Sequence, residues 1–234
     1  MKDIPEEWIK QVIEQTYIVR MPKSKLATFG ITNLRYYLVT KPSYQDLVKG
    51  EPEGVIRDGR VIAQKPQIVT PAYMLNLDGF GSNARKYMEH LAQLYGAQMP
   101  GLLYSYKNEP MDTNVVGGEP TSIARRIVDD LNKKGEDNSV VVFGVDAFWD
   151  VSLIKAIHEI TAASLSSNVN ELDNLGLLDI DPGLGVPRDA VMRIEGLFGD
   201  VERGGDSNIL KNELDRWGLF EQYQDRFLGL FKRK

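Results

Sequence analysis

Four charged side chains stand where two predicted strands end. Lys107 and Glu109 follow the apolar segment 101–106, and Asp146 and Asp150 follow the next apolar segment. If the two strands are parallel neighbours, these side chains meet at the carboxyl edge of the sheet, where open α/β sheets place their sites. The two aspartates could then hold Mg²⁺, with Lys107 on a phosphate. Alternatively, the aspartates only cap the helix that follows them.

A second candidate site is basic and aromatic. Residues 16–45 contain no Asp or Glu, and their cations alternate with tyrosines and phenylalanine. Cations neutralise phosphates and aromatic rings on a sheet can stack bases, so this segment could bind nucleic acid or another polyanion. The residues expected to do so are Arg20, Lys23, Lys25, Arg35, Tyr36, Tyr37 and Lys41. Alternatively, the tyrosines are ordinary strand residues, or the segment pairs with the acidic C-terminal half, within the chain or in a second copy.

A third candidate is an aromatic stripe near the C-terminus. Its members recur at helical spacing, and they are Trp217, Phe220, Tyr223, Phe227 and Phe231. Stripes at this spacing usually form the core of a protein. Left uncovered, the stripe could bind a partner protein or a second copy of the chain.

The remaining motifs are incomplete. Residues 79–84 match the pattern G-x-G-x-x-A, but the segment before them resembles a short helix as much as a strand, which favours a loop over a dinucleotide site. His158-Glu159 begins like a zinc-protease helix, but Ala162 stands where the second histidine is required. His90 has no visible triad partner. With no cysteine and two histidines, the chain lacks the ligands for Cys-bound zinc, an Fe–S cluster or a His-rich site.

Composition places the chain among globular proteins. It has 234 residues, of which 42% are hydrophobic and 26% charged, and its net charge is −5. The first 120 residues carry 14 Lys+Arg against 13 Asp+Glu, and the remainder carry 14 against 20. Neither a signal-peptide pattern nor a membrane-spanning run occurs, so we expect a cytoplasmic protein without membrane contact.

The predicted elements that position these candidates alternate between helix and strand. The pattern predicts a helix at 4–14, a β-rich region at 16–70 with an Asp58-Gly59 hairpin turn, and alternating helices and strands at 82–165. Two further helices are expected at 187–202 and 206–231, the second with a possible break at Gly218.

Together these elements predict an α/β or α+β fold. Its mixed sheet is antiparallel in the N-terminal part and βαβ-like in the middle, within one domain at 1–168. Residues 169–234 form a helical extension packed on that domain. We expect a non-catalytic binding, regulatory or accessory protein with a protein partner, a second copy or a nucleic acid as its ligand. The alternative is a metal-dependent enzyme, with Mg²⁺, that acts on a phosphate ester or nucleotide at the strand carboxyl ends.

Overall fold

The chain forms two compact units. The computed structural model describes residues 6–45, 47, 50–75, 89, 92–94, 96–97 and 99–231. The first unit contains residues 1–65 and 104–169, and the second contains residues 66–103 and 170–234. The described residues of 66–103, a range that the sequence placed in the first domain, belong to the same unit as the C-terminal helices. That these helices pack on the first domain stays a prediction.

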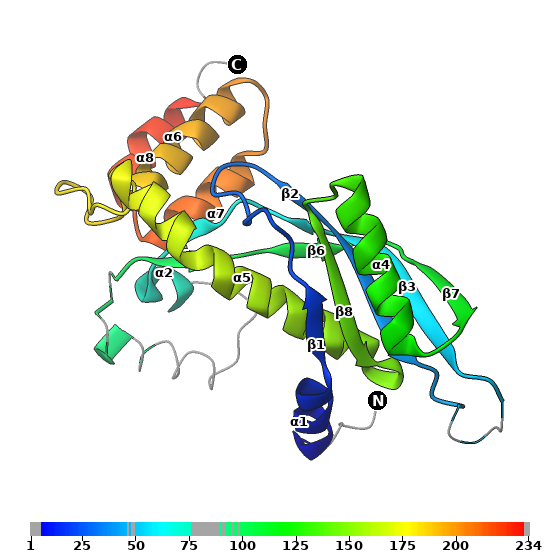
Figure 1. Cartoon of the computed structure of the whole chain (residues 1–234). Coiled ribbons are helices and arrows are strands. Elements are labelled where there is room, and N and C mark those ends of the chain that lie inside the picture. The colour runs from blue at the N-terminus through cyan, green and yellow to red at the C-terminus, as the bar shows by residue number, and fades with distance from the viewer. Residues whose placement is uncertain are drawn as a thin grey trace. The chain divides into compact units, whose positions relative to one another are not determined.

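A six-stranded mixed sheet forms the centre of the first unit (Figure 1). The strand order is β1 (Tyr17–Arg20), β8 (Ser139–Val145), β2 (Thr32–Lys41), β3 (Glu53–Ala63) and β6 (Tyr106–Asn108), and β7 (Asp112–Gly117) also pairs with β3. Strands β2 and β8 are parallel, whereas the other pairs are antiparallel. The structure thus confirms the predicted mixed sheet.

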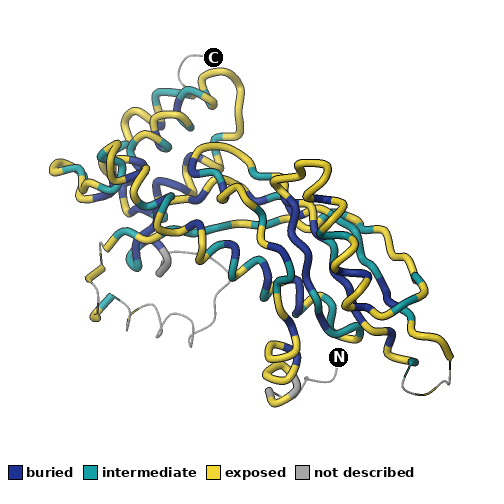
Figure 2. The backbone as a smooth tube through the Cα atoms, viewed as in Figure 1, coloured by how far each residue is buried: buried dark blue, intermediate teal, exposed yellow. Residues whose placement is uncertain are grey.

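Helices cover both faces of this sheet. The helices described in the first unit are α1 (Glu6–Gln15), α4 (Pro120–Lys134) and α5 (Trp149–Asn174). A 3₁₀ turn, η1 (Asp146–Phe148), precedes α5, and the last residues of α5 belong to the second unit. Leu38 and Val142 pack with Leu153 of α5, whereas Val39 and Val141 pack with α4. Successive strand residues point to opposite faces, so α4 and α5 lie on opposite sides. Buried positions accordingly follow the central strands (Figure 2).

A crossover connects two parallel strands that are not neighbours. Strand β7 is antiparallel to β3, β3 is antiparallel to β2, and β2 is parallel to β8, so β7 and β8 run in the same direction. Helix α4 connects β7 to β8, with β3 and β2 between them. This is the βαβ-like part of the fold. The expected first strand, at 101–106, instead contributes β5 (Gly101–Leu103), which pairs with β4 (Gln67–Val69) in the second unit.

The predicted hairpin turn at Asp58-Gly59 is wrong. Strand β3 continues through both residues, and its pairing with β2 is uninterrupted from Val55 to Ala63. A Cβ atom on Gly59 would lie 2.5 Å from the hydroxyl oxygen of Tyr36. Glycine is therefore needed here because the Tyr36 side chain passes over the strand, and not because the backbone turns.

The second unit contains a small helical core. Its described elements include the β4–β5 pair, α2 (Pro71–Leu75), α6 (Arg188–Glu202), α7 (Ser207–Trp217) and α8 (Phe220–Gly229). Asp206 caps α7 by accepting a hydrogen bond from the Asn208 N–H, and Gly218 ends it in the left-handed conformation with φ of 68°. This confirms the expected helix break. No helix in the described part of the chain is both long and apolar enough to cross a membrane.

Candidate functional site

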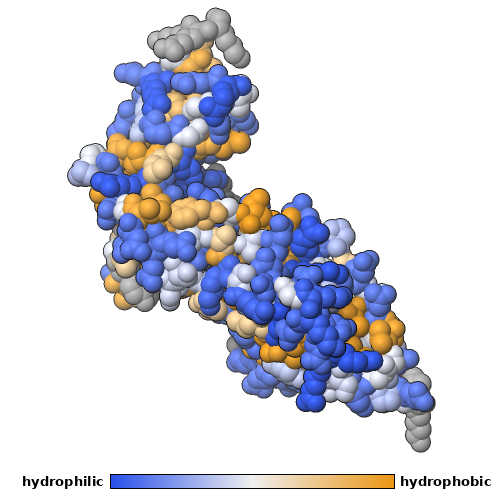
Figure 3. Space-filling model, turned by 45° about the horizontal axis from the view of Figure 1, so that its top comes forward, coloured by the Kyte–Doolittle hydropathy of each residue, from blue (hydrophilic) through white to orange (hydrophobic). Residues whose placement is uncertain are grey.

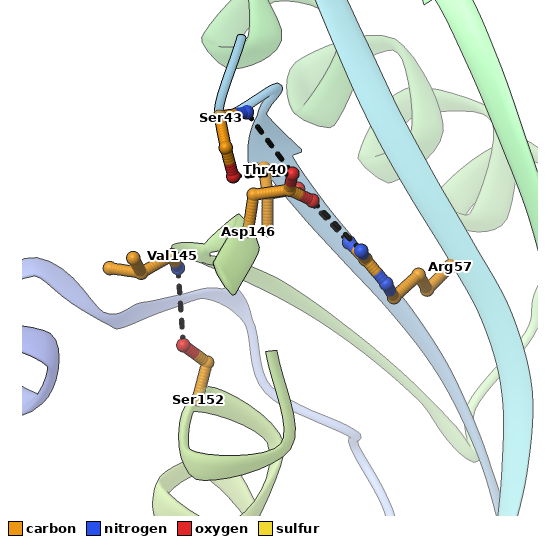
Figure 4. Close-up of polar contacts among 6 residues, drawn as sticks. All are labelled: Thr40, Ser43, Arg57, Val145, Asp146 and Ser152. Atoms are coloured by element: carbon orange, nitrogen blue, oxygen red, sulfur yellow. Dashed lines mark hydrogen bonds and ion pairs between the residues drawn. The ribbon is translucent and has the colours of Figure 1, made fainter. Parts of the chain in front are cut away.

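Asp146 lies at the carboxyl ends of two parallel strands, directly after β8 and beside the end of β2. Its carboxylate accepts hydrogen bonds from the Thr40 hydroxyl at 3.0 Å, and from the Ser43 N–H at 3.1 Å and hydroxyl at 2.9 Å. A guanidinium nitrogen of Arg57, on β3, lies 2.8 Å away. Figure 4 shows these groups converging on the carboxylate. A carboxylate offers about four lone-pair positions, so these four donors satisfy it.

The surroundings of this ion pair are largely closed to solvent. The side chains of Arg57 and Asp146 are 12% and 17% exposed. Arg57 also donates a hydrogen bond to Thr40 at 3.1 Å and lies 5.8 Å from the ring centroid of Trp149. Burial acts to raise the pKa of Asp146, but hydrogen bonds from Arg57, Ser43 and Thr40 outweigh it and hold the pKa below its ordinary value. Asp146 is therefore ionised at neutral pH.

The start of α5 is attached to the same strand end. The Val145 N–H donates a hydrogen bond to the Ser152 hydroxyl at 3.2 Å, as Figure 4 also shows, and Ser152 shares a second hydrogen bond with Thr16. Asp150 is exposed in the first turn of α5, where it accepts a hydrogen bond from the Val151 N–H at 2.9 Å. An acid in this position complements the helix dipole. Asp146 makes no such cap, since its hydrogen bonds go to residues of the β2–β3 region.

The predicted cluster of Lys107 and Glu109 with the two aspartates is not assembled. Lys107 of β6 pairs with Ile62 of β3, and Ile62 pairs with Asn33 near the start of β2. Asp146 lies beyond the other end of β2, next to Lys41. Asn33 and Lys41 are eight residues apart along the strand, or about 26 Å at roughly 3.3 Å per residue. Strand β6 does run parallel to β8, but it pairs with the last residues of β3, because β7 occupies the rest of that edge.

Lys107 and Glu109 instead belong to another surface, which we call the charged sheet face: Arg35, Asp58, Arg60, Lys107 and Glu109. Arg35 donates two parallel hydrogen bonds to Asp58, at 2.9 and 2.6 Å, which raise the pKa of its guanidinium. Arg60 lies 3.6 Å from Glu109. Most of these residues line a hollow of about 340 Å³, together with Gly59, Pro110 and Asp112.

Two residues of the predicted polyanion site are buried. Arg20 is 8% exposed and donates hydrogen bonds to Asn132 and to the carbonyl oxygens of Ser139 and Glu136. It therefore ties β1 to the end of α4 and the start of β8. Tyr36 has no exposed surface, and its hydroxyl group donates to the sulfur of Met111. Neither side chain is available to a polyanion, which corrects the prediction for both.

The other members of that predicted site are dispersed. Lys23 forms an ion pair with Asp137 at 2.9 Å, and Lys25 and Lys41 are exposed. Tyr37 is half-buried, with the Arg35 guanidinium 5.0 Å from its ring centroid. The carboxylates that face these cations come from outside residues 16–45. Which carboxylate lies beside which cation depends on strand register, and the sequence of residues 16–45 alone contains no information on that register.

Most of the aromatic stripe is core. Trp217 and Phe227 are 8% and 7% exposed, and Phe220 and Tyr223 pack against the same cluster. Phe231 differs, because it is 52% exposed and contributes to a pocket of about 650 Å³ with Val201, Arg226 and Leu230 among its other lining residues. Trp217 and Phe227 are therefore not available to a partner, whereas partner binding by Phe220, Tyr223 and Phe231 stays a prediction.

Sequence reasoning missed the buried carboxylate of Glu213. It accepts hydrogen bonds from Trp217 at 2.9 Å and Tyr73 at 3.2 Å, and it lies 2.5 Å from Arg193. Only the i, i+4 spacing to Trp217 could have suggested one of these contacts. Glu213 joins α2, α6 and α7 in the core of the second unit.

Metal and cofactor candidates gain no support from the described ranges. Within them, no three His, Cys, Asp or Glu side chains are grouped so that they could hold a metal ion. Residues 79–84 and His90 lie outside the described residues. His158 is exposed on α5. Comparison of the chain with protein-family models, curated proteins and solved structures gives no match.

Proposed function

We propose that the protein is a non-catalytic binding protein and that its ligand is a polypeptide segment held on the charged sheet face. The observation that supports this is the alternation of charge around the 340 Å³ hollow, where Arg35 faces Asp58 and Arg60 faces Glu109. A polyanion would meet three carboxylates here, those of Asp58, Glu109 and Asp112, whereas a polypeptide can present both signs of charge. Complementary charge of this kind gives specificity to protein contacts.

The surroundings of the hollow also favour an adaptable polar ligand. The side chains of Arg35 and Arg60 are 52% and 59% exposed, so both can exchange an internal carboxylate for one on a ligand. Figure 3 shows hydrophilic residues over most of the visible face of the first unit, with hydrophobic residues in small separate patches. Exposed ion pairs contribute little to folding, about 0 to 1 kcal/mol, so using them for binding costs little stability.

The enzyme alternative has less support. Asp146 was its central metal ligand, but four donors of the protein already satisfy that carboxylate. Lys107, which was to hold the phosphate, lies toward the other end of the sheet.

The experiment is a selection of random peptides displayed on phage against the immobilised protein. Arg60→Glu reverses one charge of the hollow, and Arg125→Glu makes the same change on the exposed surface of α4 as a matched control. We expect peptides that carry both charges to bind the wild type and Arg125→Glu, and to bind Arg60→Glu at least about tenfold more weakly.

Two results would overturn the proposal. In the first, no peptide is enriched, or the enriched peptides bind Arg60→Glu as well as they bind the wild type. In the second, a labelled single-stranded RNA binds the wild type with a steep salt dependence that Arg60→Glu abolishes. That result would assign the same face to a polyanion.

A further inference from the structure

One edge of the six-stranded sheet is open along β7. This strand pairs with β3 from Glu53↔Gly117 to Asp58↔Asp112 with no shift in register. In the described part of the chain, no strand pairs with its other side. Its residues are exposed apart from the half-buried Val116, and Val115 is 55% exposed. Figure 1 shows β7 at the border of the sheet, outside β3.

The backbone groups on this open side can be assigned from the ladder. The Gly118 N–H donates a hydrogen bond to the carbonyl oxygen of Pro52, just beyond the last strand pair. Hydrogen-bonded and non-hydrogen-bonded pairs alternate in an antiparallel ladder. Residues 112, 114 and 116 therefore bond to β3, whereas Thr113, Val115 and Gly117 direct their N–H and C=O groups outward. No strand of the described residues pairs with these groups, which leaves them open to water, to side chains or to another strand.

The two edges of the sheet differ in how they resist pairing. Solitary edge strands are usually short, bulged, or protected by Pro or Lys. Strand β1, at the opposite edge, has four residues and a register shift between Ile18 and Arg20. Strand β7 has six residues in regular register, and its sequence DTNVVG contains neither Pro nor Lys. It has the features of a strand that accepts a partner.

The sequence of β7 is complementary to itself. An antiparallel pair with its two-fold axis at Val115 places Thr113 opposite Gly117 and Asn114 opposite Val116. The single charge of the strand, on Asp112, then faces Gly118, so no like charges meet. A two-fold interface uses the same patch on both copies, and this patch meets that requirement.

We propose that β7 pairs with β7 of a second copy of this chain, so that two sheets join into one. The argument for the pairing does not rest on the ligand proposed for the charged sheet face, although Asp112 of β7 also lines the hollow there. Because a six-residue strand provides a small interface, we expect a weak dimer that forms reversibly as concentration rises.

Cross-linking tests the pairing directly, because the chain contains no cysteine. In the proposed register the two Val115 Cα atoms would lie about 5.5 Å apart, within the range that a disulfide spans. Under mild oxidation we expect Val115→Cys to form covalent dimers at least about tenfold faster than Asp129→Cys, a matched control on the exposed surface of α4. Equal rates would overturn the proposal.

Sedimentation equilibrium provides a second measurement, which needs neither a cysteine substitution nor an oxidant. We expect the apparent mass of the wild type to rise toward that of a dimer as the concentration approaches about 200 µM, the range of weak complexes. Val115→Lys places two like charges at the axis and should remain monomeric, whereas Val115→Thr keeps a β-branched residue and should behave as the wild type. The proposal fails if the wild type stays monomeric throughout, or if Val115→Lys associates equally well while its circular dichroism spectrum is unchanged.

Discussion

The guanidinium of Arg57 and the carboxylate of Asp146 lie 2.8 Å apart and connect β3 to the end of β8 across the strand between them. The Thr40 hydroxyl on β2 takes part in both sides of this contact, because it accepts a hydrogen bond from Arg57 and donates one to Asp146. Three adjacent strands are thus tied together where the chain leaves the sheet. We interpret Asp146 as an anchor of the fold and not as a metal ligand.

Replacing Asp146 should therefore destabilise the protein. In Asp146→Asn the nearly buried Arg57 loses its counter-charge, and breaking such a pair costs roughly 2 to 4 kcal/mol of the free energy of unfolding. Urea denaturation followed by circular dichroism measures this change. Asp150→Asn, at an exposed position four residues away, removes a charge that complements the helix dipole and should alter the free energy by less than about 1 kcal/mol. Equal stability of the two variants would contradict the anchoring role.

The same ion pair predicts how stability depends on pH. The pKa of Asp146 is lower in the folded protein than its ordinary value, so the folded state favours the ionised form. Its contribution to stability is present above the unfolded pKa of about 3.9 and is lost as the pH falls through the folded pKa. The difference in stability between wild type and Asp146→Asn should consequently be large at pH 7 and shrink below about pH 4. A difference that is constant over this range would refute the assignment.

The spacing of apolar residues correctly predicted the helices and strands in which that spacing is regular. The helix expected at 4–14 is α1, and the apolar segment that precedes Asp146 and was expected to be a strand is β8. Gly218 ends α7 as expected, because a left-handed residue there needs no Cβ. These features depend on residues close together in sequence, where propensity and capping decide the structure.

The features that the sequence concealed depend on register between distant segments. Asp58 lies opposite Tyr37 and Glu109 lies beside Arg60 because β3 pairs with β2 on one side and β6 on the other. Neither contact leaves a local signal. Lys107 was expected beside Asp146 because strand neighbours were inferred from chain order, whereas β3 and β2 lie between those segments.

Arg20 offers a third prediction. Arg20→Ala removes a buried guanidinium and leaves the carbonyl oxygens of Ser139 and Glu136 without this donor, which should cost more than about 2 kcal/mol. Arg35→Ala removes an exposed arginine from the same sheet and should cost less than about 1 kcal/mol. Urea midpoints of the two variants make the comparison. If Arg20→Ala is as stable as Arg35→Ala, Arg20 is not the structural link that its hydrogen bonds indicate.

Gly59 provides a test of why β3 carries a glycine at its centre. An alanine Cβ would lie 2.5 Å from the Tyr36 hydroxyl oxygen and 2.9 Å from the Cβ of Met111, so Gly59→Ala should cost about 1 to 3 kcal/mol through overpacking. Gly50→Ala, where nothing lies within 4 Å of the added atom, should be close to neutral.

A double-mutant cycle separates this close approach from the intrinsic strand preference of glycine. In a Tyr36→Leu background the ring and hydroxyl that meet the added Cβ are gone, so Gly59→Ala should cost less there than in the wild type. The contact with the Cβ of Met111 at 2.9 Å remains in that background, so we expect the cost to shrink and not to vanish. The same cost in both backgrounds would show that the tyrosine does not determine the glycine, and that the backbone of β3 requires it for another reason.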